Sequence, residues 1–195
     1  MERSLAAAAS IGSRIHIAGN SAAGKSTLAK HLAKVIGAPF VDLDALNWLP
    51  DWYGLNEHDP EALDRKIEAA TQGGAWVLAG SYMGHCQRTC WSRLQTIIWL
   101  DLPMPQLLWR MLRRSWRRWR SKELLWGTNY EKFWPQLAVW RKEESLVWWI
   151  VTQHQAKRLK MVEVMSDPQW AHIKVIRLTS AREIELFVKA IEGHL

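Results

Sequence analysis

Gly19-Asn20-Ser21-Ala22-Ala23-Gly24-Lys25-Ser26 is the stretch of sequence that decides the fold. It fits the pattern G-x-x-x-x-G-K-S/T at every position. An apolar segment over 14–18 precedes it and indicates a strand, and an amphipathic segment over 24–36 follows and indicates a helix. The glycines let the backbone curl so that successive N–H groups point at phosphate oxygens, and the helix N-terminus adds partial positive charge. The stretch therefore predicts a phosphate-binding loop between a strand and a helix.

Two side chains of this loop carry the chemistry of a nucleoside triphosphate site. The Lys25 ammonium is expected to reach the β- and γ-phosphates, and the Ser26 hydroxyl is placed to ligate Mg²⁺. ATP with Mg²⁺ is therefore the expected ligand. The predicted nucleotide-binding residues are Gly19, Asn20, Ser21, Ala22, Ala23, Gly24, Lys25, Ser26 and Thr27.

The rest of the chain alternates between strand and helix patterns. Further strands are predicted over 39–42, 75–79, 96–100 and 173–178, and the continuous apolar runs of 75–79 and 96–100 are typical of a parallel sheet buried on both faces. Helices are predicted from Pro60, over 103–120, over most of 130–165, and after the capping box 180–183. This alternation predicts an α/β fold of three layers, built as a single domain over residues 1–195.

Two carboxylates follow the second predicted strand. Alternation in an extended segment puts Asp42 and Asp44 on one side, at the carboxyl edge of the sheet where ligands bind in open α/β folds. Asp42 is the candidate for holding a water of the magnesium shell, and Asp44 for accepting a proton from a substrate hydroxyl. The alternative is that Asp44 only caps the next turn.

Aromatic and basic residues near these strands are open to two interpretations. Trp48, Trp52 and Tyr53 either stack on a flat acceptor or form a small local core. Arg88, after the third strand, either clamps an anionic group of the reaction or lies on the surface. For His154, with Lys157 and Arg158 on the same predicted helix, a surface role is favoured over a role in the site.

The charge and the tryptophans of the chain are concentrated in one region. The net charge is +7, and residues 105–135 contribute +6 of it through eight Lys or Arg and two Glu. Ten of the 14 Trp lie between residues 91 and 149. A uniformly basic, histone-like protein is therefore excluded. The 48% hydrophobic and 23% charged composition also excludes a disordered chain.

The predicted helix over 103–120 separates its apolar and basic residues onto different faces. The apolar stripe contains Leu108, Leu112, Trp116 and Trp119, and the basic face contains Arg110, Arg114 and Arg117. In the favoured interpretation the segment is a lid, and Arg114 and Arg117 clamp the charge of the triphosphate. In the second, the basic face binds nucleic acid with Trp stacking. In the third, the arginines are solvated and the tryptophans belong to the core.

The cysteines and the lengths of the apolar segments indicate the cellular compartment. Cys86 and Cys90 have neither the spacing of a redox motif nor that of a zinc knuckle, and are expected to be reduced thiols. The apolar runs are shorter than a signal peptide or membrane helix needs. We expect a cytoplasmic protein with no membrane partner, either a monomer or a homodimer.

Several segments together resemble a group of adenylate-kinase-related P-loop proteins, the topology-modulation or FlaR-type ATP-binding family. The resemblance covers about residues 14–188 and rests on 19–26, 43–48, 80–82, 97–103 and 109–131. It implies a nucleoside-kinase-like core with strand order 2-3-1-4-5, an acceptor-binding segment at about 48–74 and a helical lid at about 110–160. Asp42 and Asp44 also match the Asp-x-Asp that serves Mg²⁺ and the acceptor hydroxyl in related kinases such as shikimate kinase.

One position departs from the pattern of the related proteins. They usually have Asp-Gly at the end of the third strand, where this chain has Ala79-Gly80. That Asp normally orders waters of the magnesium shell, so Asp42 is expected to compensate. The predicted function is an ATP- and Mg²⁺-dependent phosphotransferase acting on a small-molecule or nucleotide acceptor. The alternative is a nucleotide-dependent, DNA-associated ATP-binding protein without a small acceptor.

Overall fold

A five-stranded parallel sheet forms the centre of the molecule in the computed structural model, which describes residues 11–134 and 145–193. The strand order is β2-β3-β1-β4-β7, so the predicted order 2-3-1-4-5 is confirmed when the strands of this sheet are counted along the chain. The strands are β1 (Arg14–Gly19), β2 (Phe40–Asp42), β3 (Trp76–Ala79), β4 (Thr96–Leu100) and β7 (Lys174–Leu178). Two of the three inner strands, β3 and β4, are buried at every residue, which explains their continuous apolar runs.

The helices connect the strands and form the lid. They are α2 (Lys25–Ile36), α3 (Leu43–Asn47), α4 (Leu55–His58), α5 (Pro60–Ala70), α6 (Met83–Thr89), α7 (Met104–Ser121), α9 (Leu146–Ser166) and α10 (Ala181–Glu192), with short 3₁₀ turns at Pro50–Trp52, Trp91–Arg93 and Pro168–Trp170. The predicted start of α5 is confirmed, because Asp59 Oδ1 accepts the Ala62 N–H at 3.0 Å. Within the described ranges, none of these helices has the length and apolar character needed to cross a bilayer.

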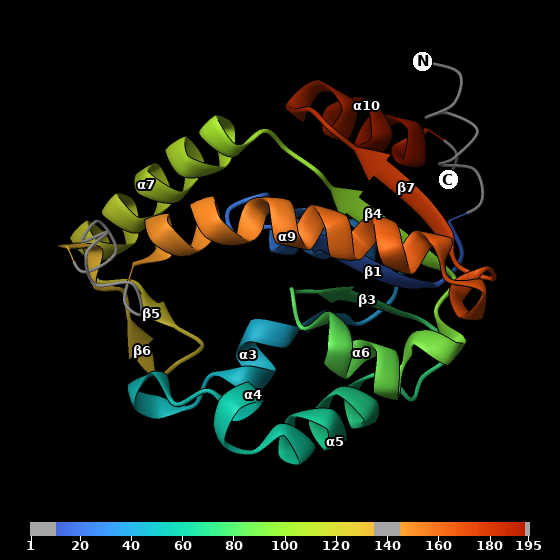
Figure 1. Cartoon of the computed structure of the whole chain (residues 1–195), viewed down its shortest axis with the longest axis horizontal. Helices are drawn as coiled ribbons and strands as arrows, with labels where there is room; N and C mark the ends of the chain where they lie inside the picture. The colour runs from blue at the N-terminus through green and yellow to red at the C-terminus, as the bar shows by residue number, and fades with distance from the viewer. Residues whose placement is uncertain (1–10, 135–144, 194–195) are drawn as a thin grey trace.

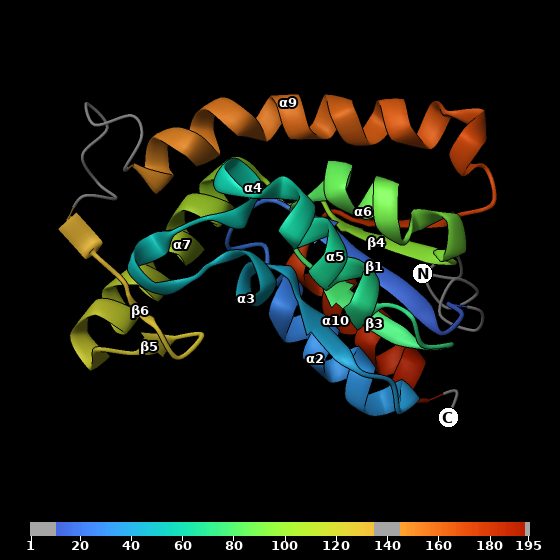
Figure 2. The ribbon, with the colours of Figure 1, turned by 90° about the horizontal axis from the view of Figure 1, so that it is seen from below.

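The helices cover both faces of the sheet and so give the three predicted layers (Figure 2). On one face, α2 and α10 bury Leu28, Leu32 and Phe187 against β1. On the other, α5, α6 and α9 close over a second cluster that contains Trp76, Trp91, Trp99 and Met161. The carboxyl ends of all five strands point to the same edge, where the lid helices α7 and α9 also lie (Figure 1).

The region after α7 differs from the prediction. The helix predicted over most of 130–165 is present as α9, but before it β5 (Leu124–Leu125) and β6 (Asn129–Tyr130) form an antiparallel hairpin that the sequence did not predict. Trp126 and Gly127 both have positive φ, 50° and 78°, as a tight hairpin turn requires. Trp is a rare residue at such a position, so the turn has no clear sequence signal. Residues 135–144, part of the lid predicted at about 110–160, lie outside the described residues.

The apolar stripe predicted for α7 is also only partly correct. The buried face of this helix runs through Leu107, Met111 and Ser115, one position away from the predicted stripe. Trp116 and Trp119 are instead 43% and 39% exposed, and their rings pack on Phe133 just after the hairpin. Their large rings therefore join α7 to the segment that follows the hairpin. They are not part of the core between α7 and the sheet.

Candidate active site at the carboxyl edge of the sheet

The phosphate loop has the predicted strand–loop–helix setting. Gly24 has a φ of 99°, a conformation that favours glycine, and it leads directly into the first turn of α2. Lys25 Nζ folds back to donate to the Asn20 carbonyl at 3.0 Å. Burial lowers the pKa of Lys25, and the negative charge of Asp44 partly opposes this shift. The Lys25 ammonium is thus a desolvated cation beside the loop, where a phosphate would neutralise it.

Asn20 supplies a second feature that fits a phosphate ligand. Its side chain is buried, and its Oδ1 accepts the Ser21 N–H at 2.8 Å. Its Nδ2 has no partner among the described residues. A buried N–H donor without a partner costs free energy, about 1–3 kcal/mol, which an incoming phosphate oxygen would remove.

Two arginines of α7 lie on the phosphate loop. Arg110 Nη1 donates to the Ala23 carbonyl at 3.2 Å, and Arg114 Nη2 lies 3.5 Å from Ser21 Oγ. They are separated by one helical turn, so both project from the same face of α7. The basic face predicted from the sequence therefore reaches the loop through these two residues.

The structure does not bring Arg117 to the loop. Its side chain is 72% exposed, and its Nη2 lies 4.0 Å from a Glu123 oxygen. Arg118 instead turns toward the buried Glu131, with Nη1 3.2 Å from Oε2. This charged pair ties α7 to the segment that follows the hairpin, so the lid has an internal anchor.

The two carboxylates after β2 do not share an extended segment as predicted. The chain turns into α3 immediately after Asp42, and Asp42 Oδ1 accepts the Asp44 N–H at 3.1 Å as the helix N-cap. The capping residue is thus Asp42, and Asp44 lies in the first turn. The negative charge of Asp44 raises the pKa of three cations near it, Lys25, Arg114 and Lys157 of α9.

Tyr82 is a neighbour of Asp44 that the sequence did not single out as a site residue. It follows β3, and burial raises the pKa of its phenol, as do the charge of Asp44 and a hydrogen bond between the two side chains. The phenol therefore stays protonated and can donate to the Asp44 carboxylate.

The residues present fit a magnesium ion. Burial raises the pKa of Asp42, and the adjacent Asp44 raises it further, so two crowded carboxylates lie where a divalent cation would relieve their repulsion. Ser26 lies at the same edge of the sheet, in the first turn of α2. Oxygen donors of this kind suit Mg²⁺, which retains several waters and binds mainly through substrate phosphates.

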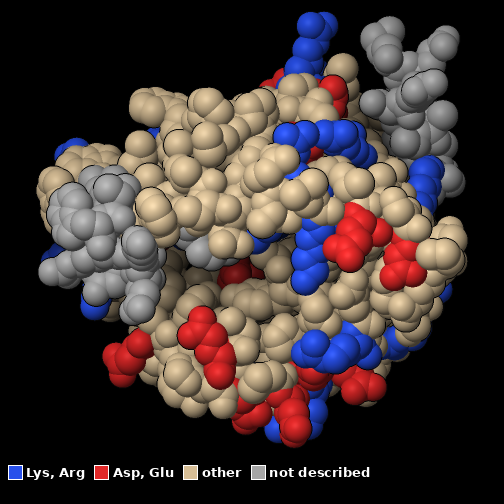
Figure 3. Space-filling model, in the orientation of Figure 1, with Lys and Arg blue, Asp and Glu red and all other residues tan. Residues whose placement is uncertain are grey.

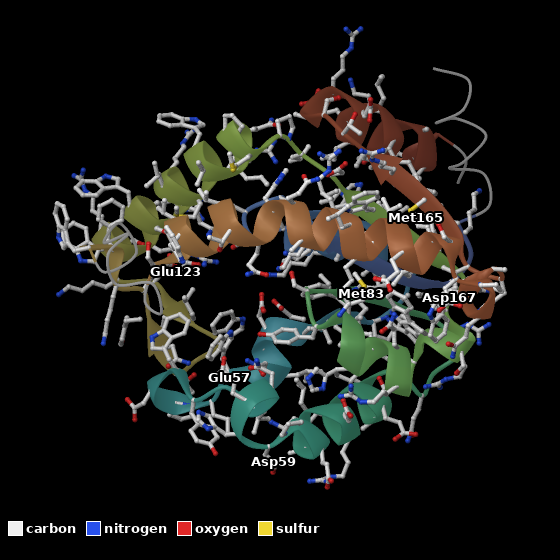
Figure 4. The ribbon with its side chains drawn as sticks, in the orientation of Figure 1. Glu57, Asp59, Met83, Glu123, Met165 and Asp167 are labelled. Carbon is white, nitrogen blue, oxygen red and sulfur yellow. The ribbon has the colours of Figure 1, made fainter. Side chains whose placement is uncertain are left out.

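A cavity of about 370 Å³ opens beside the phosphate loop. Its floor is the end of β1 and β4, one wall is the segment from Gly80 to His85, and its roof is α9. Figure 3 shows the surface hollowed between α9 and the region of α3 and α4. In Figure 4 the labelled Met83, which lines the cavity, lies at the start of α6 directly below α9.

The roof of this cavity corrects a sequence prediction. The favoured interpretation gave His154, Lys157 and Arg158 a surface role, but all three line the cavity. His154 Nε2 donates to the Leu102 carbonyl at 3.2 Å. The sequence signal that would have found them is their spacing, because residues three and four apart share one face of a helix.

An ion triad attaches α9 to the sheet at the edge of the cavity. The buried Asp101 follows β4. Its Oδ1 lies 3.0 Å from Nε of Arg158 on α9, and its Oδ2 accepts a hydrogen bond from Arg177 of β7. The Arg177 guanidinium also lies over the Trp99 ring, 4.8 Å from its centroid. Asp101 is thus fully compensated, and α9 is held in place over the site.

Arg88 and the aromatic loop lie further from the phosphates. Arg88 binds Asp64 of α5 at 2.9 Å, beside His85, and does not line the cavity. Trp48 and Trp52 pack edge to face with their ring centroids 5.6 Å apart. Trp52 makes the same kind of contact with Trp126 of the hairpin, with the centroids 5.9 Å apart. The interpretation of these tryptophans as a local core is the one that agrees with the structure.

His16 is a buried polar group under the site that the sequence gave no reason to select. Its Nε2 donates to the Gly80 carbonyl at 3.3 Å, and its Nδ1 accepts from Trp91 Nε1 at 3.2 Å. Desolvation lowers its pKa to about 4, and the charge of Lys25 contributes. Gly80 has no room for a side chain, because a Cβ there would lie 2.5 Å from that of Leu43. His16 is therefore neutral, and its hydrogen bond to the Gly80 carbonyl holds the turn after β3 in place.

The fold is shared with known P-loop kinases. Similar solved structures include a gluconokinase from Sinorhizobium meliloti 1021 (16% identity, TM-score 0.52, 94% of this chain and 91% of that one). A shikimate kinase from Bacteroides thetaiotaomicron (18%, 0.51, 93% and 97%) and a sugar kinase from a Janibacter species (18%, 0.51, 91% and 91%) are also similar. Identities at this level show the fold, which is that of the P-loop small-molecule kinases.

The sequence comparisons add no family. No family model matches the chain, and no curated protein matches it. The resemblance to the topology-modulation proteins therefore stays a prediction.

Proposed function

We propose that this protein is a phosphotransferase that moves the γ-phosphoryl group of ATP to a hydroxyl of a small molecule bound under α9. The observation that carries the proposal is the position of Asp44. Its charge acts on the phosphate-loop Lys25, on Arg114 of the lid helix and on Lys157 of the cavity roof. A carboxylate close both to the phosphate-loop lysine and to a lysine of the cavity roof is where a kinase needs an acceptor-side base.

In this mechanism the loop and α7 bind the triphosphate. The backbone N–H groups of residues 20–26 and the Lys25 ammonium hold the β- and γ-phosphates at the N-terminus of α2. Ser26 and Asp42 are the residues that would hold Mg²⁺, which when bound neutralises charge on the phosphate oxygens. Arg110 and Arg114 already lie on the loop, and their guanidinium groups stabilise the charge that shifts toward the β-phosphate during transfer.

The acceptor hydroxyl attacks from the side of Asp44. A bond forms between the acceptor oxygen and the γ-phosphorus, while the bond from that phosphorus to the β–γ bridging oxygen breaks and ADP leaves with the electron pair. The hydroxyl proton passes to the Asp44 carboxylate, which Tyr82 keeps oriented. The roof formed by α9 limits the access of water, so that ATP is not hydrolysed in place of the acceptor.

A screen of acceptors tests this function. The protein is incubated with ATP, Mg²⁺ and mixtures of sugars, sugar acids, nucleosides and nucleotides, and the products are read by mass spectrometry. A product heavier by one phosphoryl group, about 80 Da, is the expected result. ATP turnover with no phosphorylated product from any mixture would contradict the proposal.

A second candidate function has one observation in its favour. The outer side of the lid exposes Trp109 at 65% and Trp134 at 63%, near the exposed Arg113 and Arg120. Exposed aromatic and cationic side chains together are typical of surfaces that bind single-stranded nucleic acid. This DNA-associated alternative predicts retention of DNA that weakens steeply with salt, and ATP consumption only when DNA is present.

A further inference from the structure

His85 lines one wall of the cavity, and one of its two ring nitrogens already has a partner. It lies in α6, which packs beside α5 (Figures 1 and 2). Its Nδ1 lies 2.6 Å from Oδ1 of Asp64 on α5. Within residues 11–134 and 145–193, no group binds its Nε2. Nδ1 therefore joins the two helices, and Nε2 is the polar atom of this side chain that remains for a ligand.

The contact with Asp64 decides which nitrogen carries the proton. Burial raises the pKa of Asp64, but hydrogen bonds from Arg88 and His85 outweigh this and lower it, so the carboxylate is ionised. An ionised carboxylate only accepts hydrogen bonds, so a nitrogen 2.6 Å from it must bear a proton. Arg88 Nη2 also lies 3.1 Å from Nδ1, but an unprotonated Nδ1 would place two lone pairs against each other at the Asp64 contact.

The charges of this cluster balance without a charged imidazole. Arg88 Nε lies 2.9 Å from Oδ2 of Asp64, so the guanidinium compensates the carboxylate. His85 then joins the pair as a neutral group with its proton on Nδ1. In that tautomer Nε2 has a free lone pair and is a hydrogen-bond acceptor.

Tyr82 links His85 to the proposed base. The two rings pack edge to face, with centroids 6.4 Å apart and planes at 73°. Tyr82 lines the same cavity, and its phenol hydrogen-bonds Asp44. Nε2 and the Asp44 carboxylate are therefore separated by the span of one aromatic side chain. A small molecule with two hydroxyls is long enough to reach both.

Resting on the proposed function, we propose that His85 is a specificity-determining residue whose Nε2 accepts a hydrogen bond from a second hydroxyl of the acceptor. Asp64 positions it by holding the proton on Nδ1, and Arg88, predicted from the sequence as a phosphoryl clamp, supports Asp64. The acceptor is then a polyol in the broad sense, a sugar, sugar acid or cyclic polyol, with one hydroxyl at Asp44 and another at Nε2. The cavity of about 370 Å³ suits one ring or a short chain.

The position of the proton can be measured without a ligand. Long-range ¹H–¹⁵N correlation on protein with ¹⁵N-labelled histidine, assigned with His85→Asn, reports the tautomer at neutral pH. We expect the proton on Nδ1. Asp64→Asn should move it to Nε2, because the new amide donates to Nδ1 while its carbonyl still accepts from Arg88. A proton on Nε2 in the original chain, or a doubly protonated ring, would overturn the inference.

Binding is measured with four named probes, D-glucose, D-gluconate, D-ribose and myo-inositol, each beside its monodeoxy analogues. ADP and Mg²⁺ are present, so that no transfer is needed. We expect at least one probe to shift the Nε2 resonance of His85 in a saturable way. The analogue that lacks the contacted hydroxyl should bind about 3- to 10-fold more weakly, the effect of one neutral hydrogen bond. No shift of Nε2 with any of the four probes would overturn the inference.

Two substitutions separate the cavity contact from the contact with Asp64. His85→Asn places an amide near the position of Nδ1, so it should keep the contact with Asp64 and weaken the bound probe about 3- to 10-fold. His85→Gln reaches the position of Nε2, so it should retain most of the affinity and unfold at a lower temperature. His58→Asn is the matched control, because His58 is an exposed residue of α4 that does not line the cavity. Weaker binding in His85→Gln than in His85→Asn would limit His85 to a structural role between α5 and α6.

This proposal and the proposed function fail in different ways. Probes that shift Nε2 but are never phosphorylated would contradict the proposed function and leave the His85 contact intact. For an acceptor that is phosphorylated, His85→Asn should raise KM about 3- to 10-fold with little change in kcat. An unchanged KM would support the function and overturn the role of His85.

Discussion

Asn129 of the lid hairpin binds the loop that contains Trp52, because its Oδ1 accepts the Trp52 N–H at 2.9 Å. Its Nδ2 donates to the Leu49 carbonyl, also at 2.9 Å, and the residue is only 2% exposed. The indole of Trp52 donates in turn to the Tyr130 carbonyl. One buried amide thus joins the lid, at residues 124–130, to the loop 48–53 across the front of the site, as Figure 1 shows for β6 and the chain before α4.

Loss of this contact should loosen the lid. Asn129→Ala removes the hydrogen-bond partner of two part-buried backbone groups, the Trp52 N–H and the Leu49 carbonyl, at up to about 1–3 kcal/mol each. We expect faster amide exchange over residues 48–53 and 124–130, a higher KM for the acceptor, and more ATP hydrolysis without acceptor, because water reaches the site. Lys132→Ala is the control, because Lys132 is exposed just after the hairpin. Unchanged exchange in Asn129→Ala would show that the lid is held by other contacts.

The carboxylate of Asp44 should matter for transfer more than for nucleotide binding. Asp44→Asn keeps the shape of the side chain but removes the proton acceptor, so kcat should fall by about 10²- to 10⁴-fold while the Kd for ATP changes little. Asp51→Asn, an exposed position in the turn before α4, controls for the change of charge. A kcat in Asp44→Asn within twofold of the original would exclude Asp44 as the base.

The two arginines predicted as charge clamps should behave differently. Arg114 contacts the phosphate loop, so Arg114→Ala should lower kcat/KM by about 10²-fold, the effect of losing a donor to the transferring phosphoryl group. Arg117 is 72% exposed and faces Glu123, and Arg117→Ala should change kcat/KM by less than about twofold. Steady-state kinetics on both variants decides this, and equal losses would mean that Arg117 also reaches the phosphates.

Stability should rise with pH over the range in which His16 titrates. The pKa of His16 is about 4 in the folded chain and 6.5 in the unfolded chain, so between these values only the unfolded state binds the proton. The contribution is fully present above pH 6.5 and is lost as the pH falls toward 4, at most about 3 kcal/mol. Urea unfolding between pH 4 and 7 measures it. The slope should flatten in His16→Gln, and an unchanged slope would assign it to another group.

The sequence predicted those parts of the site that depend on local chemistry. The phosphate loop needs only glycines, a lysine and a hydroxyl in order between a strand and a helix, so residues 19–26 could be identified directly. The strand order followed from the family resemblance, and the buried runs of β3 and β4 from their apolar residues.

The parts that depend on tertiary contacts could not be predicted. α9 covers both the cavity and the apolar cluster on the sheet, so its inward basic residues Lys157 and Arg158 lie beside the buried Met161 and no clear apolar stripe marks the inward face. The hairpin turn uses Trp126 at a positive φ, where glycine or asparagine would be the usual signal. Asn129 is 77 residues from its partner Trp52, and no local pattern links them.

Lys25 is the residue on which phosphoryl transfer depends most directly, because its ammonium is expected to hold the transferred group. The decisive measurement follows label from γ-³²P-ATP into an acceptor, in the original chain and in Lys25→Met, with Lys30→Met on the same helix as the control. We predict labelled acceptor with the original chain and with Lys30→Met, and a loss of about 10³-fold or more in Lys25→Met with unchanged thermal unfolding. Label that reaches the acceptor equally in all three, or that never leaves ATP, would contradict the claim that this loop transfers phosphate.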